Sequence, residues 1–144
     1  MNKKVLVVVA HTDDEAFGMG GTIAKHVFNG DKVCAIAMTD GVSSRDITDD
    51  TKIIQRKSSA LQSSNYFGFK WIKLNQFPDN QLDSIPLLNI VKEIEKAKSD
   101  LQPNLIYTHS SADLNIDHQL VNQAVVTAFR PQNGEIWDEI RTFE

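Results

Sequence analysis

Residues 5–15 read VLVVVAHTDDE, a continuous apolar run that meets an acidic turn. A β-branched run of this kind is typical of a strand that is covered on both faces of a parallel sheet. The acidic residues after it favour a helix N-terminus, and Asn29-Gly30 supplies the expected stop. We therefore expect a central strand over residues 5–10, followed by a helix from about Asp14 to Phe28.

The rest of the chain repeats this alternation of strand and helix. We expect a strand over 33–38, a helix that ends near Phe67-Gly68, a strand over 70–74, a turn-rich loop over 75–84, a helix over 85–98, a strand over 105–108, a helix from about Asp117 to Phe129, and the start of another strand at 139–144. The pattern predicts an α/β fold, a three-layer Rossmann-like domain with a mostly parallel sheet and helices on both faces. We expect one domain over residues 1–144, truncated at its C-terminal end.

Composition narrows the class of protein. With 41% hydrophobic residues and a formal net charge of -4, the chain has no basic footprint for nucleic acid. The first apolar run is too short for a signal peptide, and nothing approaches the roughly 20 apolar residues of a membrane span. The single cysteine, Cys34, excludes a disulfide framework, so we expect a cytoplasmic protein.

Chemically active side chains follow two of the predicted strands. If the strand order is 3-2-1-4, the loops after the first and fourth strands flank the point where the order reverses, which is where such sheets bind ligands. Catalytic zinc commonly takes three imidazole or carboxylate ligands and leaves a fourth position for water. His11, Asp14 and His118 satisfy that count, and we expect them to bind Zn²⁺.

Asp13 stands beside the predicted ligand Asp14 without being needed as one. We interpret it as the general base that takes a proton from a zinc-bound water as the water attacks a carbonyl. Three alternatives stay open. The acidic run could serve the helix macrodipole alone, Glu15 could either do the same or orient His11, and two histidines with one carboxylate also form the ligand set of non-haem iron enzymes.

Several stretches together resemble one family. Residues 10–15 (AHTDDE) with the following 18–21 (GMGG), and residues 113–118 (DLNIDH), are similar to the first and second motifs of the PIG-L/LmbE-like N-deacetylases. Thr39-Asp40-Gly41, Arg56 and Phe77-Pro78-Asp79-Asn80 follow in the family's order.

The resemblance implies a metal-dependent hydrolase that removes an acetyl group from an N-acetylated amino sugar, glycoside or glycolipid. It assigns zinc to His11, Asp14 and His118, and the base to Asp13. It also makes Arg56 a residue for substrate binding or carbonyl polarisation, and we take Asp79 and Asn80 as further substrate-binding candidates. Relatives are often oligomeric, so the resemblance also implies a homo-oligomer that acts on a small-molecule substrate.

The sequence departs from the family pattern at three points, and the second and third motivate a second hypothesis. Thr12 replaces the usual proline, Asn115 replaces a frequent second histidine, and relatives continue past Glu144. Asn115 can donate to an oxyanion but cannot shuttle a proton, and His109, at a strand end, is either its catalytic substitute or a strand cap. The alternative to a deacetylase is therefore a catalytically impaired relative that acts as a metal- or nucleotide/sugar-binding module.

Overall fold

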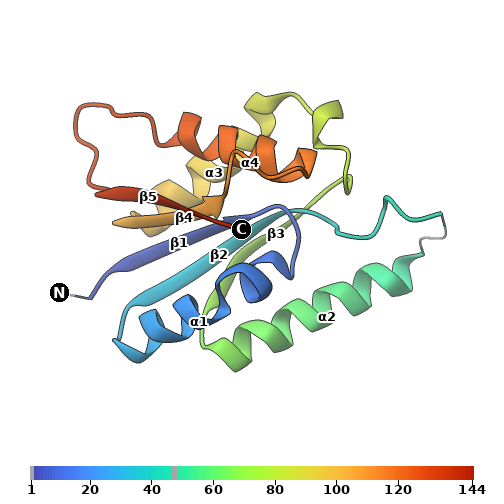
Figure 1. Cartoon of the computed structure of the whole chain (residues 1–144), viewed down its shortest axis with the longest axis horizontal. Helices are drawn as coiled ribbons and strands as arrows, with labels where there is room; N and C mark the ends of the chain where they lie inside the picture. Colours follow the sequence, from blue (N-terminus) through green and yellow to red (C-terminus); the bar gives the residue numbers. More distant parts are fainter. Residues whose placement is uncertain (1, 47–48) are drawn as a thin grey trace.

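The computed structural model describes residues 2–46 and 49–144, in which five strands form one parallel sheet of order β3-β2-β1-β4-β5 (Figure 1). The strands are β1 (Lys4–Val9), β2 (Lys32–Thr39), β3 (Lys70–Phe77), β4 (Leu105–His109) and β5 (Glu139–Phe143). The helices are α1 (Asp14–Phe28), α2 (Asp50–Phe67), α3 (Leu87–Leu101) and α4 (Ile116–Ala128), with a 3₁₀ turn at Leu82–Ser84. The predicted Rossmann-like α/β fold is confirmed.

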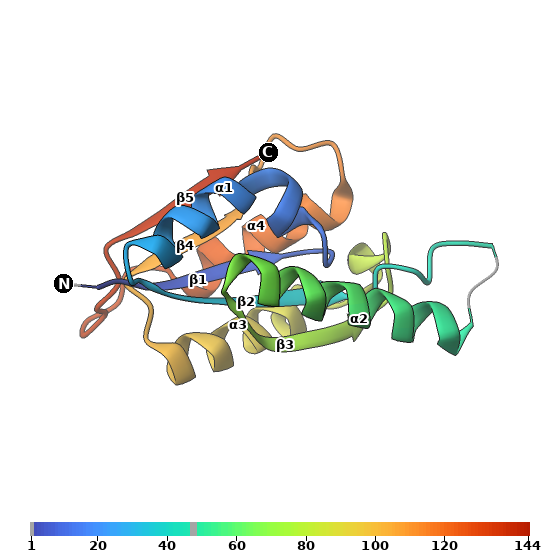
Figure 2. The same cartoon turned by 90° about the horizontal axis from the view of Figure 1, so that it is seen from below.

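The two faces of β1 carry two separate cores, because successive side chains of a strand point to opposite faces. Val5, Val7 and Val9 pack with α1, α2 and the first residues of β3. Leu6 and Val8 pack with α3 and α4. Figure 1 shows α1 and α2 on one side of the sheet and α3 and α4 on the other, and in Figure 2 α2 runs along β2 and β3.

Strand β1 lies between β2 and β4, as the predicted order required. Val5 is in register with Val33 of β2 on one side and with Leu105 of β4 on the other. The chain moves outward from β1 to β3 and then returns past β1 to β4, so strand order reverses between β1 and β4. The loops after these two strands therefore meet at the carboxyl edge of the sheet.

Two predicted boundaries were wrong. Strand β3 continues to Phe77 instead of ending at residue 74, because Phe77 pairs with Thr39 and accepts a hydrogen bond from the Asp40 amide. Helix α3 begins at Leu87 instead of residue 85, because Pro86 forces the residue before it into extended backbone (Ile85, φ -103, ψ 131). Among the described residues, no helix is long and apolar enough to cross a lipid bilayer.

Candidate metal centre at the carboxyl edge of the sheet

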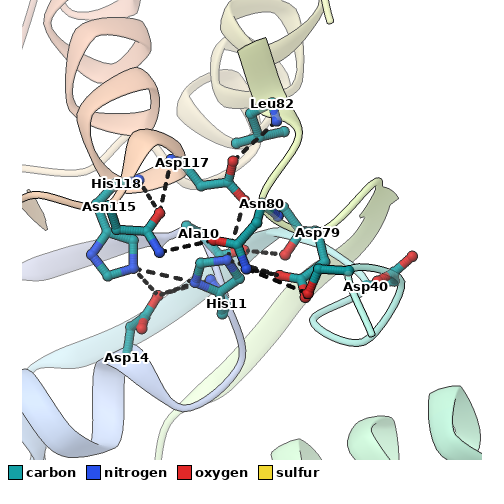
Figure 3. Close-up of polar contacts among 12 residues, drawn as sticks. Ala10, His11, Asp14, Asp40, Asp79, Asn80, Leu82, Asn115, Asp117 and His118 are labelled. Carbon is teal, nitrogen blue, oxygen red and sulfur yellow. Dashed lines mark hydrogen bonds and ion pairs between the residues drawn. The ribbon is translucent and has the colours of Figure 1, made fainter. Parts of the chain in front are cut away.

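Three side chains from two distant segments converge beyond the ends of β1 and β4 (Figure 3). His11 follows β1, Asp14 opens α1, and His118 lies in the first turn of α4. A tight turn brings the first two together, since Oδ2 of Asp14 accepts a hydrogen bond from the His11 amide at 2.8 Å. The structure thus brings together all three residues that the sequence predicts as ligands.

The three ligand atoms form a nearly equilateral triangle. Nδ1 of His11 lies 3.2 Å from Nε2 of His118 and 3.3 Å from Oδ2 of Asp14, and the third side, from His118 to Asp14, is 3.4 Å. Zinc bonds of about 2.0–2.1 Å in tetrahedral geometry place ligand atoms roughly 3.3–3.4 Å apart. The triangle matches one face of such a tetrahedron and leaves its fourth corner for a water or substrate oxygen.

The nitrogen of each histidine that faces away from the triangle is held by carboxylates. Nε2 of His11 lies 3.1 Å from Oδ2 of Asp117 and 3.0 Å from Oδ1 of Asp79, and Nδ1 of His118 lies 2.7 Å from Oδ2 of Asp113. Such partners fix the tautomer and orientation of metal-binding histidines. Asp79 is thus a buried partner of His11 whose side chain faces inward, and its contact with substrate stays a prediction.

The carboxylates around His11 and His118 give the site a negative charge that positive groups must balance. Burial by itself would lower the pKa of His11, but the hydrogen bonds that its ring donates to Asp117 and Asp14 and the charges of Asp14 and Asp79 outweigh burial and raise that pKa to about 10. Burial opposes ionisation of Asp14, yet His109, His11 and His118 hold the pKa of this carboxyl far below its ordinary value. Protons on the imidazoles or a divalent cation supply that positive charge, so the site favours a cation.

Asp117 also ties the two halves of the site together. Its Oδ2 accepts from the Asn80 amide at 2.7 Å and its Oδ1 from the Leu82 amide at 3.0 Å. Asn80 has left-handed backbone (φ 52), which asparagine tolerates better than most residues. Its exposed side chain sits at the rim of the site, consistent with its predicted contact with substrate.

Asp13, the predicted base, is held by the predicted substrate residue Arg56. The carboxylate Oδ1 of Asp13 lies 2.7 Å from Nη2 of Arg56, and Nε of Arg56 donates to Oγ1 of Thr12 at 3.1 Å. Gly41 makes room for the guanidinium, since a Cβ there would lie 3.1 Å from Nε in a backbone of φ +69. The Thr12 that replaces the family's proline therefore gains a specific contact, which the sequence did not reveal.

Asn115 serves as the N-cap of α4. Its Oδ1 accepts from the amides of Asp117 and His118 at 2.8 and 3.4 Å, and its Nδ2 donates to Oδ1 of Asn80 at 3.0 Å. Oδ1 is in use, but the amide NH₂ has two donor hydrogens and Asn80 takes only one, so donation by Asn115 to an oxyanion stays a prediction. The short side chain suits this cap because an Asn oxygen satisfies amides that a helix start leaves unpaired.

His109 lies behind the triangle, with 1% of its surface exposed. Its Nε2 accepts from the Ala10 amide at 2.9 Å, and its ring stacks on that of His118 with centroids 3.8 Å apart. Burial lowers its pKa and outweighs the attraction of Asp14. The buried position favours the alternative of a strand-end structural residue, and a catalytic role in contact with substrate stays a prediction.

Glu15 does not reach His11. It is fully buried, its Oε1 accepts from Oγ of Ser63 in α2 at 3.4 Å, and its Oε2 has no hydrogen-bond partner among the described residues. Burial first, and then the charges of Asp14 and Asp13, raise its pKa to about 7. The sequence analysis gave no role to Asp113, which contacts His118 in the structure. The two residues are five positions apart and Asp113 lies on a loop, so no helix or strand periodicity indicates the contact.

Comparison with known proteins agrees with this geometry. The family model described as PIG-L, GlcNAc-PI de-N-acetylase, matches residues 6–129. The chain is 31% identical over 133 residues to the uncharacterized deacetylase YaiS of Escherichia coli (strain K12), an overlap that covers 89% of this chain and 69% of that protein. It is 32% identical over 83 residues to the diacetylchitobiose deacetylase of Thermococcus kodakarensis, covering 56% of this chain and 31% of that protein.

Among solved structures, the N,N'-diacetylchitobiose deacetylase from Pyrococcus horikoshii superimposes with a TM-score of 0.83 at 22% identity. The match covers 98% of this chain and 60% of that one, so this chain spans only part of these relatives. At this identity the superposition supports the fold.

Proposed function

Because the chain belongs to the PIG-L family of de-N-acetylases, we propose that it is a zinc-dependent hydrolase that removes the acetyl group from an N-acetylated amino sugar, glycoside or glycolipid. The observation that carries the proposal is the triangle of His11, Asp14 and His118, whose sides of 3.2–3.4 Å suit tetrahedral zinc. Deacetylation of N-acetylated sugars is the activity that the names of the relatives state.

A bound zinc ion would supply Lewis acidity and bring the pKa of a coordinated water towards neutrality. The residues of this chain then have separate tasks. His11, Asp14 and His118 would hold the ion, while Asp79, Asp113 and Asp117 fix the two imidazoles from behind.

Asp13 accepts the proton of the attacking water and later gives it to the leaving amine. Its carboxylate is partly exposed beside the triangle, which suits a group that must exchange a proton with water and substrate. Arg56 holds this carboxylate by an ion pair and places a positive charge next to the position where the amide oxygen becomes negative. Asn80 at the rim is a candidate for a hydrogen bond to the sugar.

The test combines metal content with acetate release from N-acetylglucosamine derivatives. We expect stoichiometric zinc in the purified protein and acetate release that falls by at least about 100-fold in Asp13→Asn with zinc retained. The matched control is Asp100→Asn, which removes an exposed carboxylate of α3. Iron in place of zinc, or no metal, would refute the zinc assignment, and full activity of Asp13→Asn would remove Asp13 as the base.

One observation favours the second candidate, a binding module without turnover. Asn115 caps α4 and cannot shuttle a proton, and His109 is buried, so neither of these two residues is placed to act with Asp13 as a second acid for the leaving amine. Isothermal titration with N-acetylglucosamine and with nucleotides separates the two. Binding of either ligand without acetate release would favour the module, and acetate release at many turnovers per chain would exclude it.

A further inference from the structure

A second cavity, of about 660 Å³, lies away from the metal centre between α1 and strands β4 and β5. It opens near the amino ends of β1 and β2, whereas the ligand triangle lies beyond the carboxyl end of β1. Its walls carry three basic side chains, Lys3, Lys25 and Arg141, and one carboxylate, Asp31. Together with Glu139, which forms an ion pair with Arg141, there are two carboxylates for three basic groups, a small local excess of positive charge on a chain whose net charge is -4. Such a concentration attracts anions to a concave surface.

The carboxylate of Asp31 is already engaged on both oxygens. Oδ1 accepts from the Lys3 amide at 2.7 Å, and Oδ2 lies 2.6 Å from Nδ1 of His26. The hydrogen bond with His26 comes first among the causes that lower the pKa of Asp31. Asp31 thus acts as an acceptor for the wall of the cavity. Within the described part of the chain, the ammonium of Lys25 makes no hydrogen bond or ion pair.

A hydrogen-bonded chain extends from this carboxylate to the edge of the sheet. Nε2 of His26 lies 3.0 Å from the Tyr107 hydroxyl, and Nη1 of Arg141 donates to the same hydroxyl at 3.3 Å. Nδ1 of His26 donates to the Asp31 carboxylate. In the neutral tautomer Nε2 then accepts from the hydroxyl, whose oxygen in turn accepts from Arg141. The other amino group of Arg141 binds Glu139 at 2.6 Å. The guanidinium is therefore fixed in the cavity wall at both ends.

We propose that this cavity binds the phosphate group of a small anionic ligand. The basic groups come from three separate elements, the start of β1, the second half of α1, and β5, and the hydroxyls of Thr22 and Thr142 line the same space. Donors that approach from several directions match the tetrahedral oxygens of phosphate better than the planar oxygens of a carboxylate. The volume is in the range that takes a small ligand. This site uses none of the residues of the metal centre.

The test is calorimetric titration of the zinc-loaded chain with inorganic phosphate, in parallel with malonate, combined with ¹H–¹⁵N spectra that locate the bound anion. We expect phosphate to shift the amides of residues 2–3, 25–29 and 141–142. The variants Lys25→Gln and Arg141→Gln should each weaken binding about tenfold, which is the size of one charge-assisted hydrogen bond. Arg130→Gln, an exposed arginine outside the cavity, serves as the matched control and should bind as the parent does.

Four results would overturn the proposal. The first is no phosphate binding at millimolar concentration, and the second is an undiminished affinity in both cavity variants. The third is spectral shifts confined to residues 11–14 and 113–118, which would place the anion on the metal centre. Malonate bound as tightly as phosphate would refute the phosphate assignment.

Discussion

Asp117→Asn is the substitution that best tests whether the carboxylates behind the metal centre orient its histidines or only make the surface acidic. Asp117 is fully buried and makes three contacts, to Nε2 of His11 and to the amides of Asn80 and Leu82. An asparagine keeps one oxygen acceptor and turns its NH₂ towards a donor. One of these contacts is therefore lost, and the negative charge that holds His11 disappears.

Two magnitudes follow from this geometry. Loss of a carboxylate partner of a metal-binding histidine weakens metal affinity by about 10–100-fold. A buried amide left without an acceptor lowers the free energy of unfolding by about 1–3 kcal/mol. Asp113→Asn should lower zinc affinity less, because Asp113 is partly exposed and water can replace its hydrogen bond to His118.

Zinc affinity is measured by competition with a chromophoric chelator, and stability by urea unfolding of the metal-free chain. Asp83→Asn, a substitution of an exposed aspartate in the neighbouring 3₁₀ turn, is the matched control. If Asp117→Asn and the control both bind zinc within about twofold of the parent, Asp117 does not orient His11. The role assigned to the carboxylates behind the two histidines would then be wrong.

Three further predictions concern stability and activity. Glu15 has a pKa of about 7 in the folded chain against 4.5 in the unfolded chain, so ionising it lowers the free energy of unfolding as pH rises from 4.5 to 7 and has no effect below pH 4.5. In urea unfolding, Glu15→Gln should therefore raise the free energy of unfolding by up to about 3 kcal/mol at pH 8 and by little at pH 4. An equal effect at both pH values would contradict the assigned burial. Gly68 has a φ of +80, and a Cβ added there would lie 2.9 Å from a neighbouring side chain, so Gly68→Ala should lower the free energy of unfolding by about 1–2 kcal/mol. Gly134→Ala should cost less, because the φ is similar and the space around it is open. Equal losses in the two variants would show that the close contact is unimportant. Arg56→Gln should reduce acetate release by at least tenfold, because it removes the ion pair with Asp13. Thr12→Val removes one hydrogen bond to Arg56, worth about 1 kcal/mol, and should reduce acetate release by about fivefold. A larger loss from Thr12→Val than from Arg56→Gln would show that the ion pair contributes less to activity than the Thr12 hydrogen bond.

The fold could be predicted because its decisive signals are local. A run as apolar as residues 5–10 is compatible with a central parallel strand and with little else, and the reversal of strand order then dictates where ligands gather. The positions of His11 and His118 follow from that topology alone. The boundary at Leu87 was missed because an amphipathic pattern runs through Pro86, while the backbone constraint of proline stops the helix.

The roles behind the metal ligands could not be predicted in the same way, because they depend on side-chain direction across distant loops. Asp79 and Asn80 are adjacent in sequence, yet one faces His11 and the other faces solvent. Asn115 matches the place of a catalytic histidine in sequence, but its short side chain reaches the amides of its own helix first. His109 ends a strand that is buried to its last residue, and burial determines its role.

The central claim is that His11, Asp14 and His118 hold a zinc ion through two imidazole nitrogens and one carboxylate oxygen. Zinc K-edge X-ray absorption of the loaded chain tests it most directly. We predict nitrogen and oxygen neighbours at about 2.0–2.1 Å, the outer-shell scattering of two imidazoles, and loss of one imidazole in His118→Ala. A sulfur neighbour at about 2.3 Å, or a spectrum that His118→Ala leaves unchanged, would contradict it.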